Sequence, residues 1–161
     1  MRFVPPEEMI VHETPHWRIN QRVNCPVPGY LMVGAKAANA VELSDLTEAA
    51  QREIGSLLAQ ATRILRAALG AERVYVARFG HDPGHTVHFH VIPVYSWIVA
   101  AYHADARYAV EPNPDGGNLT LFIWREYCES GSPPPCSGPS VAASIATLRS
   151  RFSESGGRTS G

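Results

Sequence analysis

Clusters of basic residues are missing from this sequence of 161 residues. Lysine is almost absent, the arginines are dispersed, and no run of lysines and arginines occurs. The formal net charge is −1. A surface that binds nucleic acid by neutralising many phosphates is therefore not expected. A small anionic ligand needs only a few local donors, so the composition does not exclude one.

Cysteines and long apolar runs are scarce as well. The three cysteines, Cys25, Cys128 and Cys136, form no C-x-x-C pair, so we expect reduced thiols in a cytoplasmic protein. No charged start precedes an apolar stretch, and no apolar run is long enough to span a bilayer. The sequence therefore predicts neither a secretory signal nor a membrane partner.

The length fits one domain, and an apolar content of 45% is enough for a single core. We place this domain at residues 1–152, with its core at about 13–126 and a linker and helix at 130–152. Residues 153–161 are polar and glycine-rich, which predicts a disordered tail.

Hydrophobic periodicity predicts an order of strands, a long helix, strands and a short helix. Expected strands or strand pairs lie at 13–23, 30–35, 73–79, 85–99 and 118–126. A long helix is expected at 44–69, capped by Ser44 or Thr47 and ended by Gly70. A short amphipathic helix follows at 141–152, and 100–117 is expected to be a loop. This order predicts an α+β fold with an antiparallel sheet of about five strands.

Four of the seven histidines fall within residues 81–90. From His85 onward the residues favour a strand, whose side chains alternate between faces. Thr86, His88 and His90 are then expected on one face, where two imidazoles and a hydroxyl suit binding a phosphate and attacking it. A structural pair of histidines is the plainer alternative, although both rings must then be hydrated or hydrogen-bonded.

Zinc is a second alternative, because His-x-His on a strand is a common partial ligand set. A tetrahedral site needs three or four ligands, which His81, Asp82 and His85 would have to complete. In a regular strand His85 points away from His88, and the cysteines show no paired ligand spacing. We therefore predict no metal site.

Residues 13–99 resemble the histidine triad superfamily of nucleotide hydrolases and transferases. The segment from Pro28 to Val33 is similar to the family's Pro-Gly-His strand, with Tyr30 where a histidine is common. A capped helix follows, and the segment from Gly84 to Pro93 is similar to the family's signature strand. The resemblance implies a histidine triad-like fold.

The signature departs from the family pattern His-x-His-x-His in its first position, which holds Thr86. His85 is one residue out of step and should face away unless a bulge re-aims it. In another alignment, Gly84, His85 and Thr86 match the family's Gly-Gln-Ser/Thr phosphate-binding turn. His85 then replaces the glutamine and Thr86 donates to phosphate. Both alignments remain open at this point.

The resemblance implies chemistry at an α-phosphate without a cofactor. His88 matches the histidine that attacks phosphorus, and His90, with Thr86 or His85, matches the phosphate-binding groups. Family members often hold the ribose with Asp or Asn before the Pro-Gly turn, which makes Asn20 and Asn24 the candidates here. Such proteins are commonly homodimers, and the predicted strand at 119–124 and the apolar run 95–102 are candidates for the interface.

The resemblance leaves the reaction open among three alternatives. Transferases of the family tend to carry glutamine in the third position, so His90 favours a hydrolase. Its substrate would be a dinucleoside polyphosphate, a nucleoside phosphoramidate or an adenylylated small molecule. The alternatives are a nucleotidyltransferase that passes the nucleotidyl group to phosphate or a metabolite, and a nucleotide-binding module without turnover.

Overall fold

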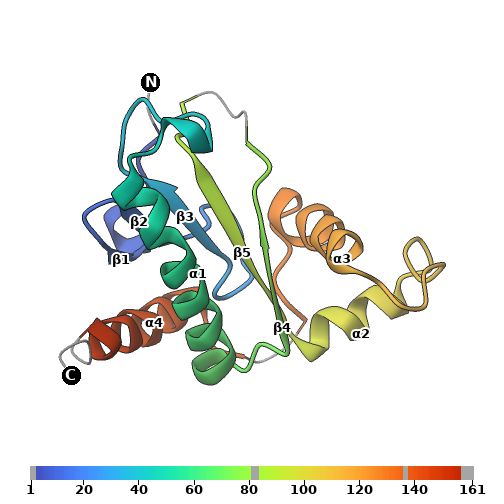
Figure 1. The fold of residues 1–161 in the computed structure, drawn as a ribbon. Coiled ribbons are helices and arrows are strands. Elements are labelled where there is room, and N and C mark those ends of the chain that lie inside the picture. Colours follow the sequence, from blue (N-terminus) through green and yellow to red (C-terminus); the bar gives the residue numbers. More distant parts are fainter. Residues whose placement is uncertain (1–2, 81–83, 136–137, 157–161) are drawn as a thin grey trace.

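The computed structural model describes residues 3–80, 84–135 and 138–156, which form one antiparallel sheet with helices on both faces (Figure 1). In spatial order the strands are β1 (Ile10–Glu13), β2 (Trp17–Gln21), β3 (Leu31–Ala35), β5 (His88–Val94) and β4 (Arg73–Ala77). The helices are α1 (Glu48–Leu69), α2 (Ser96–Ala104), α3 (Gly116–Ile123) and α4 (Val141–Gly156). Short helical segments are η1 (Glu7–Met9), η2 (Leu43–Asp45) and the π-helical η3 (Trp124–Glu129). The α+β fold expected from the sequence is confirmed.

Helix α1 packs against one face of the sheet, with α4 beside it. Its start is fixed by the Thr47 side chain, which accepts a hydrogen bond from the backbone of Ala50, and its end by Gly70 in the left-handed conformation. The predicted apolar stripe is buried at Ala50, Leu57, Ala61, Ile64 and Leu65. The indole of Trp17 on β2 donates to the Ala50 carbonyl and ties helix to sheet.

The turn between β2 and β3 packs against the end of α1. The buried Gln21 side chain donates to the Val27 carbonyl and accepts from the backbone of Gly29. Gly29 has φ +75°, and a Cβ there would lie 2.7 Å from a Leu69 methyl carbon. The Pro-Gly turn therefore needs glycine both for its conformation and for its close approach to the helix.

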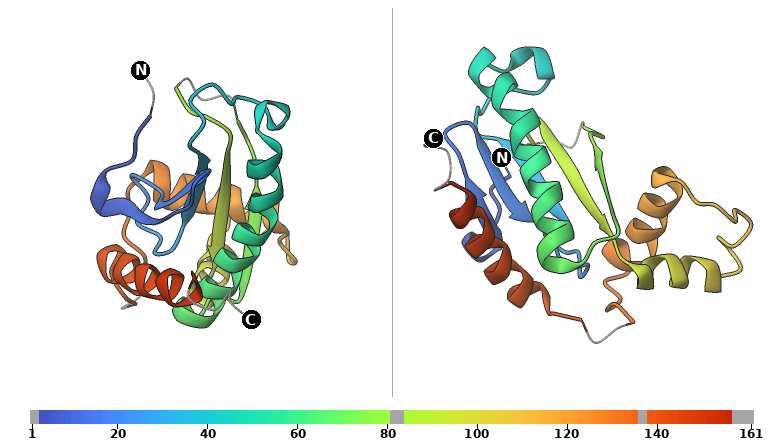
Figure 2. Two further views of the ribbon diagram at one scale, coloured as in Figure 1. Left: turned by 60° about the vertical axis from the view of Figure 1, so that its left-hand side comes forward. Right: turned by 60° about the horizontal axis from the view of Figure 1, so that its bottom comes forward.

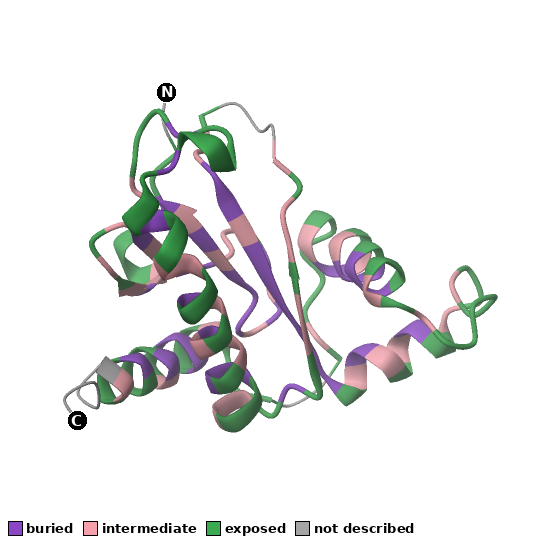
Figure 3. Cartoon of the chain, in the orientation of Figure 1, coloured by how far each residue is buried: buried purple, intermediate pink, exposed green. Residues whose placement is uncertain are grey.

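Helices α2 and α3 and segment η3 lie on the other side, where they cover only part of the sheet (Figures 2 and 3). The start of α3 lies on β4, since a Cβ at Gly116 would lie 2.7 Å from the Tyr75 ring. Trp124 at the start of η3 donates from its indole to the Tyr30 hydroxyl at 2.6 Å. The uncovered part of this face carries the histidines of β5.

The prediction of a strand at 118–126 is wrong, because these residues belong to α3 and η3. Leu119, Phe122 and Ile123 are buried at helical spacing, whereas Leu121, which the alternation pairs with them, is 43% exposed. The Asp115 side chain caps the helix by accepting from the backbone of Asn118. A short apolar run fits both periods, and here the cap decides for the helix.

Three other boundaries differ from the prediction. The histidine strand ends at Val94 rather than near 99, because α2 begins at Ser96 and occupies part of the expected loop at 100–117. The fifth strand is β1, which lies just before the predicted 13–23 segment. Helix α4 continues to Gly156, so 153–156 are helical rather than part of a disordered tail, whereas 157–161 lie outside the described residues. Arg149 of α4 donates to the carbonyls of Glu7, Glu8 and Ile10.

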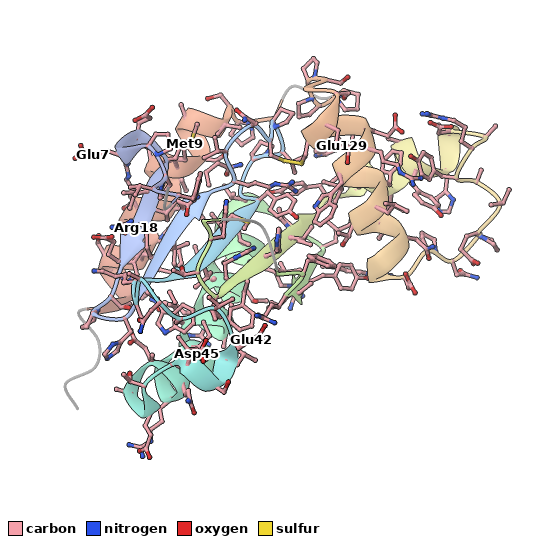
Figure 4. All side chains as sticks on the ribbon, turned by 90° about the horizontal axis from the view of Figure 1, so that it is seen from above. Glu7, Met9, Arg18, Glu42, Asp45 and Glu129 are labelled. Carbon is pink, nitrogen blue, oxygen red and sulfur yellow. A yellow bond between two sulfur atoms is a disulfide. The ribbon has the colours of Figure 1, made fainter. Side chains whose placement is uncertain are left out.

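Cys25 and Cys128 form a disulfide, which overturns the expectation of reduced thiols (Figure 4). The two cysteines are 103 residues apart, and the bond joins the turn after β2 to η3. Spacing along the chain gave no signal for this pairing, since it exists only through the fold. Among the described helices, none is long and apolar enough to cross a membrane.

The disulfide predicts that stability depends on the redox state. Because the bond closes a long loop, a dithiol reductant should lower the free energy of unfolding by about 2–4 kcal/mol. Thermal melting with and without reductant measures this loss. The double variant Cys25→Ser, Cys128→Ser should show a similar loss and no response to reductant. Alkylation of the denatured, unreduced chain should add one label, and three labels would contradict the disulfide.

Candidate functional site

The open face of the sheet presents its side chains in rows that cross β2, β3 and β5. Arg18, Gly34 and His88 form the first row, and Asn20, Met32 and His90 form the second. A third row holds Arg22 and Tyr30, whose backbones are hydrogen-bonded at 2.7 Å. These three rows form the floor of the candidate site, and the third runs beneath η3.

His88 opens β5 and is buried, with its Nδ1 2.8 Å from the backbone carbonyl of Thr86. A carbonyl oxygen can only accept, so Nδ1 carries the hydrogen and Nε2 keeps its lone pair. Within the described residues, no group bonds Nε2. This neutral tautomer is the one that a nucleophilic imidazole requires.

His90 lies one row away and bonds a different group. Its Nδ1 is 3.0 Å from the Tyr30 hydroxyl, which also accepts from the Trp124 indole. Because an indole N–H only donates, the hydroxyl proton is available for His90 Nδ1, and the ring hydrogen then lies on Nε2. Burial, aided by the nearby Arg22, His88 and His85, lowers the pKa of His90 to about 3. His90 is therefore a neutral hydrogen-bond donor.

His85 stands beside His88, contrary to the expectation that it faces away. The ring centroids of His85 and His88 are 5.3 Å apart, and those of His88 and His90 are 5.4 Å apart. The strand begins only at His88, so alternation along a strand does not govern His85. Phe3 stacks on the His85 ring at 4.5 Å. Three imidazoles thus lie in series although the sequence lacks the first histidine of the family pattern.

Thr86 contributes to the site mainly through its backbone. Its hydroxyl donates to the Ala35 carbonyl at 2.7 Å, so the proton expected to bind phosphate is already used. Its own carbonyl orients His88. The link between Thr86 and Ala35 ties the residues before β5 to the end of β3.

A groove runs from the histidines across β3 to β2 and is roofed by the N-terminal segment. It is lined by Phe3, Pro5, Arg18, Asn20, Met32, Gly34, Ala35, Lys36, His85, Thr86 and His88. Of the two predicted ribose-binding candidates, Asn20 lines this groove. Asn24 does not; it is exposed in the turn after β2, with φ 58°. Gly34 lies at the middle of the floor, and a Cβ there would meet no atom within 4 Å.

Three residues at the site were missed by sequence reasoning. Tyr30 was expected in the core or a base pocket, Trp124 on a strand, and Arg22 was not considered. The Arg22 guanidinium carbon lies 5.0 Å from both the Tyr30 and the Trp124 ring centroids. The position of Tyr30 in the Pro-Gly strand was a usable signal, whereas nothing in the sequence linked Trp124 to β5.

The zinc alternative has two parts. His81 and Asp82, two of its candidate ligands, lie outside the described residues. In the part of the chain that the structure describes, no group of three or more histidine, cysteine, aspartate or glutamate side chains is placed to hold a metal ion.

Comparison with solved structures returns histidine triad proteins. A zinc-bound histidine triad family protein from Mycobacterium smegmatis matches with a TM-score of 0.56 and 14% identity, over 92% of this chain and 86% of that one. A histidine triad protein from Bradyrhizobium japonicum matches with a TM-score of 0.53 and 18% identity, over 90% and 92%. The NitFhit protein of C. elegans matches with a TM-score of 0.52 and 19% identity, over 76% of this chain and 27% of that one.

The chain therefore has the histidine triad fold, as its resemblance to that superfamily implied. At the level of sequence alone, no family model and no curated protein matches it. The identities are low, so these matches establish the fold and leave the chemistry to the residues of the site.

The lowered pKa of His90 predicts how stability depends on pH. Between pH 6.5 and about 3, the unfolded chain binds a proton that the folded protein does not. The contribution of His90 is therefore complete above pH 6.5 and is lost as the pH falls toward 3. Urea unfolding at about pH 7 and about pH 4 measures this loss. NMR of the His90 ring provides the direct check, and a titration midpoint near 6.5 would contradict the prediction.

Proposed function

We propose that the protein is a nucleotide hydrolase that cleaves at the α-phosphate of a nucleoside phosphate derivative through a nucleotidyl-His88 intermediate. One observation carries the proposal: His88 bonds the Thr86 carbonyl through Nδ1, which leaves Nε2 with a lone pair next to His90. A nucleophile with a fixed tautomer beside a neutral donor is the arrangement that attack on phosphorus needs.

In the proposed first step, the Nε2 lone pair of His88 forms a bond to the α-phosphorus. The bond from phosphorus to the leaving group breaks, and the leaving group departs with the electron pair. His90 Nε2–H donates to a phosphoryl oxygen and stabilises the negative charge there. In the second step, water attacks the nucleotidyl phosphorus, loses a proton and frees the His88 ring. His85 supplies the third imidazole in place of the family's first histidine.

The groove takes the nucleoside in this proposal. It begins at His88 and crosses the glycine gap at Gly34, and Asn20 on its floor is the candidate for the ribose. Asn24 is dropped as a ribose ligand, because its turn lies apart from the groove. The groove gives no preference among bases, since its lining offers few base-edge partners.

The two alternatives stand on different outcomes of the same chemistry. A nucleotidyltransferase would use the His88 adduct but need an added acceptor. A binding module without turnover was suggested by the missing first histidine, and His85 beside His88 weakens that suggestion. Hydrolysis remains the preferred reaction because His90, not glutamine, fills the third position of the signature.

A homodimer remains part of the proposal, but not through the interface expected from the sequence. Leu119, Phe122 and Ile123 were expected on an interface strand and are instead buried within this chain. Ile98 and Tyr102 of the apolar run at 95–102 are buried as well. The edge strand β4, with Val76 exposed, is the available sheet edge in the described part of the chain.

His88→Ala tests the nucleophile. With diadenosine tetraphosphate and adenosine phosphoramidate as substrates, we expect the variant to lose activity by about a thousandfold or more. Intact mass of the wild type during turnover should reveal a nucleotidyl adduct that the variant lacks. His103→Ala, an exposed histidine on α2, serves as the matched control and should retain wild-type activity.

Release of mononucleotide in water alone supports the hydrolase. Dependence on an added acceptor favours the transferase, and nucleotide binding without any adduct favours the binding module. A His88→Ala variant that still hydrolyses both substrates would overturn the proposal.

Gly34→Val tests the groove. Because a Cβ at Gly34 enters open space and valine suits a strand, we expect the variant to fold with an unchanged or higher melting temperature. The added methyl groups should raise KM about tenfold by filling the floor of the groove, with a smaller effect for Gly34→Ala. An unchanged KM in the valine variant would show that the substrate lies elsewhere.

A further inference from the structure

Arg22 is a cation without a counter-ion at the edge of the site. In the described part of the chain, five other arginines pair with carboxylates: Arg18, Arg52, Arg78, Arg107 and Arg151. Arg22 forms no such pair there, and its Nη1 is buried with no hydrogen-bond partner among the described residues. An unpaired guanidinium nitrogen out of water is costly, so an anion that reaches it is strongly favoured.

Two aromatic rings hold the Arg22 side chain in place. Its guanidinium carbon lies 5.0 Å from the ring centroids of Tyr30 and Trp124. Cation–π contact of this kind stabilises the charge but leaves hydrogen-bond donors in the guanidinium plane unused. The same two rings form the hydrogen-bond chain to His90, so the charge stands next to the predicted phosphate donor.

The position of Arg22 in the third row separates it from the groove. His88 and His90 occupy the first two rows, and consecutive rows are roughly 7 Å apart along a strand. The groove leaves the histidines across the sheet toward β2, over the first two rows. With the α-phosphate over His88 and His90 and the nucleoside in the groove, the group that extends toward the third row is the leaving group.

We propose that Arg22 binds a negatively charged leaving group, and that the substrate is therefore a nucleoside polyphosphate whose β-phosphate lies on this guanidinium. The assignment rests on the proposed function, because it takes the α-phosphate to lie over His88. When the bond between the α-phosphorus and the bridging oxygen breaks, its electron pair stays on the β-phosphate. Arg22 stabilises the charge that develops there, which a neutral amine leaving group does not require.

A comparison of two substrates tests Arg22. We expect Arg22→Met to lower kcat/KM for diadenosine tetraphosphate about tenfold or more, with little change for adenosine phosphoramidate, whose leaving group is ammonia. Methionine keeps much of the packing between the two rings, and thermal melting checks that the variant is folded. Arg22→Lys should recover part of the loss, since it restores the charge but not the planar fork. Arg63→Met, an exposed arginine on α1, is the control.

An equal loss on both substrates would overturn the assignment of Arg22 to the leaving group. If the wild type turns over neither substrate, the proposed function fails, and binding of ADP and AMP by calorimetry then tests Arg22 separately. Arg22→Met should weaken ADP binding about tenfold more than AMP binding, because only ADP carries a β-phosphate. Equal weakening of both nucleotides would reject the β-phosphate site.

Discussion

The antiparallel pairing of β3 with β5 is the constraint on which the site depends. It places Gly34 opposite His88 and Met32 opposite His90, so the nucleophile faces a gap in the floor rather than a side chain. The odd-numbered residues of the same strands, such as Val33 and Phe89, point into the core beneath α1. A slip of one residue would bury both histidines and expose that core, so core packing also fixes the register of the site.

The second face of the sheet gains its chemistry from being covered only in part. Helix α3 and η3 bury the third row and bring Trp124 onto Tyr30, while the first two rows stay open to the groove. The disulfide between Cys25 and Cys128 joins the turn after β2, which lies between Arg22 and Tyr30, to η3. Burial lowers the pKa of His90 at the boundary between the two halves, where a phosphate donor must be neutral yet reachable.

The features that were predictable from the sequence are those set by local chemistry. The cap at Thr47, the stripe of α1, the Pro-Gly turn and the strand of His88 and His90 follow from residues near one another in the chain. The fifth strand, the disulfide and the contact of Trp124 with Tyr30 depend on elements that only the fold brings together. His85 failed for another reason: alternation was extended to residues that precede the strand, where backbone irregularity sets the direction of each side chain.

His88 and His90 show how the same side chain acquires two roles two residues apart. The partner of His88 Nδ1 is a carbonyl, which can only accept, so that ring keeps its lone pair on Nε2. The partner of His90 Nδ1 is a hydroxyl already held by an indole donor, so its proton points to the ring and Nε2 carries the hydrogen. Both rings are neutral in this arrangement, and one offers an electron pair where the other offers a proton donor. The difference arises from Thr86 and Tyr30, so the two histidines cannot exchange roles without exchanging those partners.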